Sequence, residues 1–599
     1  MNAVSPSLDL APALVVLPGP KCAIADGSGA RAVRPPDARD LFEQGRALVA
    51  HAGLTARRLG LSTPPRSREL YDALELYAFA RPARFCAPSA VGLAQALGLP
   101  EPKSPVEQCE TLKTACGQLL AELAENPWPS REECLALAET LGRAGWAWAP
   151  AIIQALRSRP VRDGFRGSGL EVWARIPEWE DQAPLGEAGS KPIFSEEAER
   201  RLETLLGRAG LDEARPTQKQ FAGEAAFAFQ PREREGEPRM MLAEAGTGVG
   251  KTMAYLAPAS LWAEANGPAV WVSTYTRALQ RQIERESHAI FPDPAIRKSK
   301  AVVRKGRENY LCLLNLQEAT NAAQLGNGDL IGIALAARWT RATRDGDMTG
   351  GDFPAWLPTL FAVGAAAQAS PANLVDRRGE CVHAGCIHYR ACFIEKAVRA
   401  SRRADIVIAN HALVLTQAAF DGARQARGAK QDGESAHLKR IVFDEGHHLF
   451  DAADSAFSAA LSGQEAAELR RWIRGPENRG RRGRGLEQRL MDLVGGREDA
   501  KATLLNAIRA AAALPGDGWS GRIAPPSGEV NPIGPIEAFL VSGDYDYIIR
   551  IAVRDTRDYE RLLRERLYRI PGIRHSKSGF VLRSLKQSRL PLSVVAPAA

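Results

Sequence analysis

The sequence predicts an α/β fold built on a parallel sheet, and three observations lead to this prediction. From about residue 195, short apolar segments alternate with helix-compatible ones, such as Val270–Ser273 before Arg277–Glu286. A glycine-rich segment follows the apolar residues at 240–242 and precedes another helix-compatible run. An apolar segment, Ile441–Phe443, leads directly into an acidic turn. Strands that end in such polar loops before a helix are typical of doubly wound sheets.

The glycine-rich segment at residues 243–252 reads AEAGTGVGKT and predicts a phosphate loop. Its glycines allow backbone N–H groups to turn toward phosphate oxygens, while Lys251 supplies a positive charge and Thr252 a hydroxyl for Mg²⁺. Position 245 is Ala where the general motif has Gly. We therefore expect the phosphates of ATP to be held by Ala245, Gly246, Thr247, Gly248, Val249, Gly250, Lys251 and Thr252.

The acidic turn after the strand at 441–443 reads Asp444-Glu445-Gly446-His447. An isolated Asp–Glu pair is usually an ordinary exposed turn, but its pairing with a phosphate loop favours a catalytic role. The turn resembles the DEAH box of helicases. This resemblance implies that Asp444 holds Mg²⁺, Glu445 orients and deprotonates the attacking water, and His447 couples the nucleotide to the rest of the domain.

Two weaker motifs flank the phosphate loop. Arg215 and Gln218, in the segment RPTQ, are candidates for contact with adenine, because an amide can both donate to and accept from the base edge. Downstream, residues 273–276 read STYT and are followed by Gln280 and Gln282. Hydroxyls and amides suit sequence-independent contacts to a nucleic-acid backbone, although a plain strand end and helix cap would explain the same residues.

The nine cysteines fall into two groups. Five are scattered through the first quarter of the chain and are expected to be buried apolar residues: Cys22, Cys86, Cys109, Cys116 and Cys134. The other four are Cys312, then Cys381, Cys386 and Cys392 with the spacing C-x4-C-x5-C. Four thiolates suit a 4Fe-4S cluster. Zinc also accepts four sulfurs, usually at shorter spacings, and free buried thiols are the third alternative.

Composition predicts a cytoplasmic protein with polyanionic partners. The formal charge is +8, the pI is near 9.0, and no run of apolar residues is long enough to cross a bilayer. No secretion signal is recognisable, so disulfides are not expected. An arginine-dense segment at residues 470–484 is a candidate for phosphate contact, with a solvated loop as the alternative.

Together, the phosphate loop, the acidic DEGH turn, the RPTQ segment and the four cysteines resemble the DinG/XPD family of iron-sulfur DNA helicases. The resemblance covers about residues 215–523 and includes KGR at 305–307 and ADIVIANHALVL at 404–415. It implies a RecA-like ATP-binding motor domain at 195–450, a DEAH box at 444–447, an iron-sulfur insertion at about 304–400 and a partial Arch-like helical region at 451–524. It also implies a role in DNA repair, ATP, Mg²⁺ and a 4Fe-4S cluster as cofactors, single-stranded or forked DNA as partner, and 5′-to-3′ movement, with Arg304, Lys305 and Arg307 positioning the DNA.

Residues 1–190 are predicted to form a mainly helical region with no catalytic signature. The segment VAHAGLTARRLGL at 49–61 resembles part of a 3′-to-5′ exonuclease domain, but Thr55 and Ala56 stand where an Asp is expected. Such nucleases need several carboxylates that converge on two metal ions. We therefore expect a degenerate, inert scaffold.

Residues 534–592 resemble the C-terminal half of Lrp/AsnC-type regulators and predict a small α+β ferredoxin-like fragment. Alternating apolar residues predict strands at 536–540 and 547–553, a helix from Asp555 and a last strand at 580–585. In that family the module binds small effectors and assembles subunits, so the fragment is a candidate for homo-oligomer formation.

No motif of a second motor domain follows residue 521, so we expect low ATPase activity from this chain alone. A gene fusion or a misread reading frame would each explain this junction. Two functions remain open: a DinG-type helicase lacking its second motor domain, and a module that binds ATP and DNA without unwinding.

Overall fold

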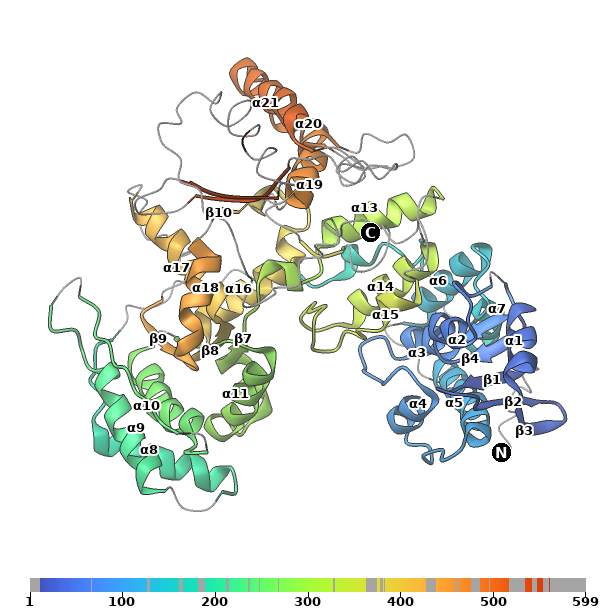
Figure 1. Cartoon of the computed structure of the whole chain (residues 1–599), viewed down its shortest axis with the longest axis horizontal. Coiled ribbons are helices and arrows are strands. Elements are labelled where there is room, and N and C mark those ends of the chain that lie inside the picture. The colour runs from blue at the N-terminus through green and yellow to red at the C-terminus, as the bar shows by residue number, and fades with distance from the viewer. Residues whose placement is uncertain are drawn as a thin grey trace. The chain divides into compact units, whose positions relative to one another are not determined.

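The computed structural model describes the chain in two compact units, Met1–Ala453 and Asp454–Ala599 (Figure 1). The described residues are 11–65, 67–125, 130–160, 165–180, 189–211, 215–234, 237–246, 248–267, 269–326, 329–361, 374–376, 381, 383–426, 438–457, 459–460, 463–475, 485–494, 496–515, 534–540, 547–552 and 560. Within this part of the chain, no helix is long and apolar enough to span a lipid bilayer.

The predicted parallel sheet is confirmed in the first unit. Its strands are β6 (Val270–Thr274), β7 (Ala301–Val303), β8 (Ile406–Asn410) and β9 (Arg440–Phe443), in the order β7-β8-β6-β9 and all parallel. Because the carboxyl ends of parallel strands meet at one edge, the residues after β6, β8 and β9 are brought together there.

Helices accompany this sheet at the intervals that the sequence predicts (Figure 1). A hydrophobic core that includes Leu202, Leu256, Val272 and Ile408 joins these helices to the strands. The helices of this region are α8 (Ser195–Arg208), α9 (Pro216–Ala225), α10 (Lys251–Asn266), α11 (Arg277–Ile290), α12 (Pro294–Lys300), α16 (Phe393–Arg403), α17 (His411–Ala426) and α18 (Leu449–Phe457).

One predicted element is absent. Residues 240–242 were expected to end a buried strand before the phosphate loop, but Met240 is 73% exposed, Leu242 is 96% exposed, and residues 237–246 carry no strand. The residues that lead into this segment, REREGEPR at 232–239, are charged residues, Gly and Pro, which are depleted in strands. The phosphate loop is therefore reached from an extended segment.

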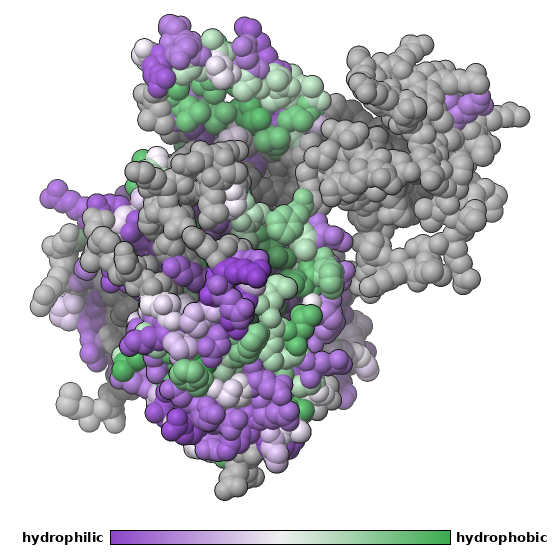
Figure 2. Space-filling view, turned by 90° about the vertical axis from the view of Figure 1, so that its left-hand side faces the viewer, coloured by the Kyte–Doolittle hydropathy of each residue, from purple (hydrophilic) through white to green (hydrophobic). Residues whose placement is uncertain are grey.

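The surface around the motor sheet contains both hydrophilic and apolar residues. Figure 2 shows a largely hydrophilic lower face crossed by a band of apolar residues. Large apolar side chains that are exposed on α17 and α18 include Phe420, Phe450 and Phe457. Single exposed apolar residues of this kind are common on folded proteins.

The N-terminal region contains a sheet that the sequence did not predict. Its strands are β1 (Ala13–Val16), β2 (Cys22–Asp26), β3 (Gly29–Val33), β4 (Ala47–Val49) and β5 (Leu70–Asp72), in the order β3-β2-β1-β4-β5. β1, β2 and β3 are antiparallel, whereas β4 runs parallel to β1 and β5. Strands of three to five residues are too short to leave a clear periodic signal.

Helices surround this sheet and agree with the predicted helical character of the region. The five N-terminal cysteines are buried, as predicted, and burial raises the pKa of Cys86 and Cys109 to about 12. The helices are α1 (Pro35–Glu43), α2 (Ala52–Arg58), α3 (Ala73–Ala80), α4 (Ala90–Leu97), α5 (Pro105–Glu125), α6 (Arg131–Arg143) and α7 (Ala149–Arg157).

The segment after Cys312 packs with this N-terminal region. It contains α13 (Leu313–Gln324), α14 (Leu330–Ala342) and α15 (Leu357–Leu360), and its apolar residues share one core with β1 and helices α3 to α7. The motor sheet has a separate core. Residues 311–361 and the N-terminal region therefore form one continuous body, which we call the composite body.

Specific polar contacts join the two parts of the composite body, the N-terminal region and residues 311–361. The buried guanidinium of Arg338 donates from Nε to the Phe79 carbonyl at 2.7 Å and lies 4.8 Å from the Phe79 ring centroid. The Trp356 indole donates to the Cys86 carbonyl at 2.8 Å. His51 Nε2 lies 2.9 Å from Thr359 Oγ1. These contacts give hydrogen-bond partners to buried polar groups, which would otherwise lower the stability of the fold.

The second unit contains α19 (Gly463–Arg474), α20 (Leu486–Val494), α21 (Glu498–Ala510) and three antiparallel strands. β11 (Gly534–Leu540) pairs with β10 (Ala459–Ala460) and with β12 (Tyr547–Ala552), which confirms the two predicted strands. The helix predicted from Asp555 and the strand predicted at 580–585 lie outside the described residues.

Two arginines of the arginine-dense segment contact the chain itself, and the phosphate contact of this segment stays a prediction. Arg470 donates to the carbonyls of Ala512 and Leu514, and Arg474 donates to the Ile508 carbonyl at 3.2 Å. These arginines satisfy carbonyl groups at the end of α21, where a helix leaves its last acceptors unpaired. Residues 476–484 lie outside the described part.

We predict that Trp356→Ala destabilises both halves of the composite body, by about 3–5 kcal/mol, because it removes a buried indole and its hydrogen bond. Amide hydrogen exchange should accelerate in residues 73–97 as well as in residues 330–361. Phe194→Ala, at a side chain that is 54% exposed, is the matched control and should cost less than about 0.5 kcal/mol. Faster exchange confined to residues 330–361 would contradict the shared core.

Candidate nucleotide site

The phosphate loop ends where α10 begins. Gly248 and Gly250 have φ angles of +82° and +84°, a region that glycine adopts without steric cost, and Lys251 is the first residue of α10. The first N–H groups of a helix have no partner within it and attract anions. Lys251 Nζ donates to the Ala245 carbonyl at 3.2 Å. Gly246 and Val249 are described, whereas Thr247 is not.

The acidic turn meets this loop. Lys251 Nζ lies 3.8 Å from Glu445 Oε1, and both side chains are about one-third exposed. Glu445 adopts a left-handed backbone with φ of +56°, which is uncommon for a residue other than glycine and recurs at functional sites. The structure thus brings together the two motifs that the sequence predicted to cooperate.

Asp444 lies deeper than Glu445. Its backbone N–H donates to the Ser273 carbonyl at 2.8 Å, which ties the start of the acidic turn to β6. Burial raises the pKa of the Asp444 carboxyl, the neighbouring Glu445 raises it further, and Lys251 lowers it. A bound cation would favour the ionised form of this carboxyl.

Tyr255 is a site residue that the motif analysis missed. Its hydroxyl is buried beside Thr252 and Asp444, and its pKa is raised by burial and by the Asp444 charge. Tyr255 follows Thr252 by three positions on α10, so both side chains lie on one face of the helix. That spacing is the signal that could have identified it.

Hydroxyl and carboxylate oxygens from Thr252 and Asp444 are suitable ligands for Mg²⁺. His447 Nδ1 lies 3.4 Å from Glu445 Oε2, and its side chain is exposed. The Lys251 ammonium, the Thr252 hydroxyl and two carboxylates therefore lie around the phosphate loop. These are the groups that phosphoryl transfer to water requires.

Arg215 and Gln218 contact the phosphate loop itself. Arg215 Nη1 donates to the Gly248 carbonyl, and Gln218 Nε2 donates to the Gly250 carbonyl, each at 3.0 Å. A Cβ atom at Gly250 would lie only 2.2 Å from Gln218 Nε2, so this close approach requires glycine. Both side chains therefore hold the loop, and their contact with adenine stays a prediction.

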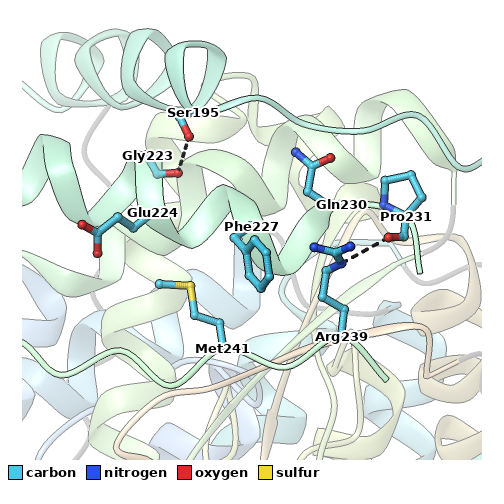
Figure 3. A pocket seen from close by; sticks show the side chains of 8 residues that line it. All are labelled: Ser195, Gly223, Glu224, Phe227, Gln230, Pro231, Arg239 and Met241. Carbon is cyan, nitrogen blue, oxygen red and sulfur yellow. Dashed lines mark hydrogen bonds between the residues drawn. The ribbon is translucent and has the colours of Figure 1, made fainter. Parts of the chain in front are cut away.

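A cavity lies beside α9 and the segment that leads to the phosphate loop (Figure 3). The Arg239 guanidinium packs over the Phe227 ring at 4.6 Å and donates from Nε to the Pro231 carbonyl at 3.1 Å. The cavity is lined by Ser195, Gly223, Glu224, Phe227, Gln230, Pro231, Arg239 and Met241.

Three of the four cysteines of the predicted cluster, Cys312, Cys381 and Cys392, lie near one another. Cys312 precedes α13, and Cys392 precedes α16. Burial raises the pKa of Cys312 to about 12 and that of Cys392 to about 11, with smaller increases from Cys392 on Cys312 and from Cys381 on Cys392. Among the described residues, however, no three cysteine, histidine or acidic side chains are gathered closely enough to hold a metal ion.

The three basic residues expected to position DNA are engaged within the chain. Arg304 donates to Ser401 Oγ at 3.3 Å and lies over the Trp271 ring, Lys305 forms an ion pair with Asp347, and Arg307 Nε lies 2.8 Å from Asp376 Oδ2. Lys305 and Arg307 are thus paired with carboxylates, whereas Arg304 contacts a hydroxyl and an aromatic ring. Their contact with DNA stays a prediction.

The segment at residues 273–276 is divided between the interior and the surface. Ser273 and Thr274 are fully buried, Thr276 caps α11 by accepting from the Leu279 N–H, and Tyr275 is 48% exposed. Gln280 is buried, and Gln282 donates to Glu286. Of the polar residues predicted to contact a nucleic-acid backbone, Tyr275 is accessible, whereas Ser273 and Thr274 are not.

Comparison with known proteins identifies relatives of this region. Residues 227–319 match the model of the DEAD/DEAH box helicase family, and residues 536–591 match that of the Lrp/AsnC ligand binding domain. The "ATP-dependent DNA helicase YoaA" of Escherichia coli is 31% identical over 259 residues, which are 43% of this chain and 36% of the relative.

Two further relatives carry the name DinG. The "ATP-dependent DNA helicase DinG" of Photobacterium profundum is 32% identical over 38% of this chain and 32% of its own length. The "3'-5' exonuclease DinG" of Bacillus subtilis is 29% identical over 40% of this chain and 23% of its own length. The chain thus spans about a third or less of the length of these relatives. It carries a DEAD/DEAH box helicase domain and is homologous to DinG and YoaA proteins over about two-fifths of its length.

Proposed function

We propose that this chain is an ATP-dependent DNA helicase of the DinG type that acts in the cytoplasm on single-stranded or forked DNA with 5′-to-3′ movement. The observation that carries the proposal is the 3.8 Å approach of Lys251 to Glu445 at the start of α10, with Asp444 and Thr252 beside it. The YoaA and DinG relatives, which are named ATP-dependent DNA helicases, supply the substrate class.

In this proposal the phosphate loop and Lys251 bind the β- and γ-phosphates. Thr252 and Asp444 hold Mg²⁺, which neutralises charge that develops on the phosphates. Glu445 orients the attacking water and accepts its proton, with Lys251 and His447 as its neighbours. Arg215 and Gln218 hold the loop and contribute to recognition of the adenine.

A second candidate function is binding of ATP and DNA without unwinding. It is favoured by the single parallel motor sheet in the described part of the chain. Helicase motors use arginines from a second motor body, which contribute on the order of 10³–10⁵ in rate. A chain that supplies only the first body would bind nucleotide but turn it over slowly.

We further propose that Cys312, Cys381, Cys386 and Cys392 hold a 4Fe-4S cluster. Support comes from the nearness of three of these cysteines, since Cys392 raises the pKa of Cys312 and Cys381 raises that of Cys392. The cluster would stabilise these thiols as thiolates and tie Cys312 to the segment that ends at Cys392. Zinc on the same sulfurs is the alternative.

The N-terminal region is proposed to be an inert scaffold that descends from an exonuclease. Its β1 strand has no carboxylate, and Thr55 and Ala56 are buried. The buried Asp72 accepts the N–H groups of His51, Ala52 and Leu74 at 3.1, 2.6 and 3.0 Å, so this acid stabilises backbone turns. The Lrp/AsnC-like fragment at 534–592 is proposed to promote self-association.

The first test compares Lys251→Ala and Glu445→Gln in purified chain. Lys251→Ala should weaken ATP binding by at least about tenfold, whereas Glu445→Gln should keep binding and lower DNA-stimulated phosphate release by about 10²–10⁴-fold. Lys219→Ala, which removes a surface lysine from α9, is the matched control. Strand displacement on a 5′-tailed duplex separates the two candidate functions. Equal phosphate release by all variants would refute the assignment of this site.

The second test concerns the cysteines. Anaerobically purified chain should be brown and contain iron and sulfide, and Cys381→Ser should lose both. Cys86→Ala, which alters a buried thiol of the N-terminal region, should keep the colour. A colourless chain that contains zinc would rule out the cluster.

A further inference from the structure

Three neighbouring strands place aromatic rings at the same edge of the motor sheet. His411 follows β8, Tyr275 follows β6, and His448 lies five positions after the end of β9. The Tyr275 and His448 rings are stacked, with centroids 4.0 Å apart and an angle of 14° between their planes. Neither His411 nor His448 has a role in the proposed function.

His411 stabilises this edge of the sheet through buried contacts. It is buried, its Nδ1 lies 2.7 Å from Ser273 Oγ, and its ring lies 5.8 Å from that of Phe443. The carbonyl of Ser273 accepts the N–H of Asp444. The end of β6 is therefore held both to α17 and to the acidic turn.

The stacked pair connects an accessible residue to the nucleotide site. Tyr275 is 48% exposed and, together with the exposed Thr276, forms the accessible part of the segment expected to contact DNA. His448 belongs to the short helix η8 (Gly446–His448), and its ring lies 4.0 Å from that of His447. His447 Nδ1 in turn lies 3.4 Å from Glu445 Oε2. A continuous series of contacts thus runs from the surface at Tyr275 to the carboxylate proposed to activate water.

We propose that the Tyr275–His448 stack couples DNA binding at the end of β6 to ATP binding at the phosphate loop, with His448 as a positioning residue. This inference rests on the proposed function, because it requires both ligands to bind. DNA that displaces Tyr275 moves His448 and, through η8, the position of Glu445. Coupling of this kind is reciprocal, so ATP must change DNA affinity by the same factor as DNA changes ATP affinity.

The test measures the factor by which ATP changes DNA affinity, and it does so without ATP turnover. The affinity of a fluorescent oligothymidylate is determined with and without a non-hydrolysable ATP analogue for the full chain and its variants. For the unaltered chain, the ratio of the two DNA affinities, with and without the analogue, should lie within about 5 to 150. His448→Ala should bring the ratio close to 1 while each ligand still binds alone, whereas His448→Phe should preserve it because a phenyl ring can stack on Tyr275.

Two controls make the result specific. Phe450→Ala removes an exposed ring two positions from His448 and should leave the ratio unchanged. Tyr275→Ala combined with His448→Ala should lower the ratio no further than His448→Ala does, because both changes break the same contact.

The outcomes separate the inference from the proposed function. A ratio unchanged in His448→Ala, or a ratio of 1 in the unaltered chain with both ligands bound, would overturn the coupling and leave the helicase proposal intact. Additive losses from the two substitutions would also overturn it. An unaltered chain that binds neither ATP nor DNA would refute the proposed function and, with it, the coupling.

Discussion

The candidate site depends on the position of β6 between β8 and β9. β6 pairs in parallel with both neighbours, from Val270 to Thr274 along β8 and from Val270 to Ser273 along β9. This register fixes where the three strands end, and the hydrogen bond from the Asp444 N–H to the Ser273 carbonyl extends it by one residue. Because the helix that follows the phosphate loop shares a core with β6 and β8, Lys251 is held on the same framework as Glu445.

The site was predictable where chemistry requires particular residues at short spacing. The phosphate loop at 243–252 and the strand at 441–443 were recognisable because glycines, a lysine and paired acids must follow one another closely. The roles of Arg304, Lys305 and Arg307 were not predictable in the same way. Their partners Ser401, Asp347 and Asp376 are distant in sequence, so only the folded chain reveals the hydrogen bond of Arg304 and the ion pairs of Lys305 and Arg307.

The same limit applies to the fold of the N-terminal region. Its strands are short and form a mixed sheet whose order differs from the order in sequence, so local periodicity gives little indication of it. The contacts of His51 with Thr359 and of Arg338 with Phe79 join positions about half the chain apart. A shared core of this kind is visible only in three dimensions, since each helix alone shows merely which of its faces is apolar.

The composite body gives the N-terminal region a physical role. Helix α14 buries almost its whole length, including Arg338 and Trp339, against α3 and α6. Without the N-terminal region, these apolar residues and a buried guanidinium would face water or a collapsed cavity. The N-terminal region is therefore required for packing of the segment that begins at Cys312, whatever other role it has.

The size of the Tyr275–His448 contact is consistent with a coupling role. An aromatic pair contributes about 0.5–1.5 kcal/mol beyond the area that it buries, and coupling between two ligand sites is typically about 1–3 kcal/mol. One stack can thus account for a substantial part of such coupling. Stacked rings can also slide across one another without losing contact, whereas a hydrogen bond breaks within a fraction of an ångström. This tolerance suits a contact at the edge of the sheet, where Tyr275 remains accessible while Ser273 stays fixed beside His411.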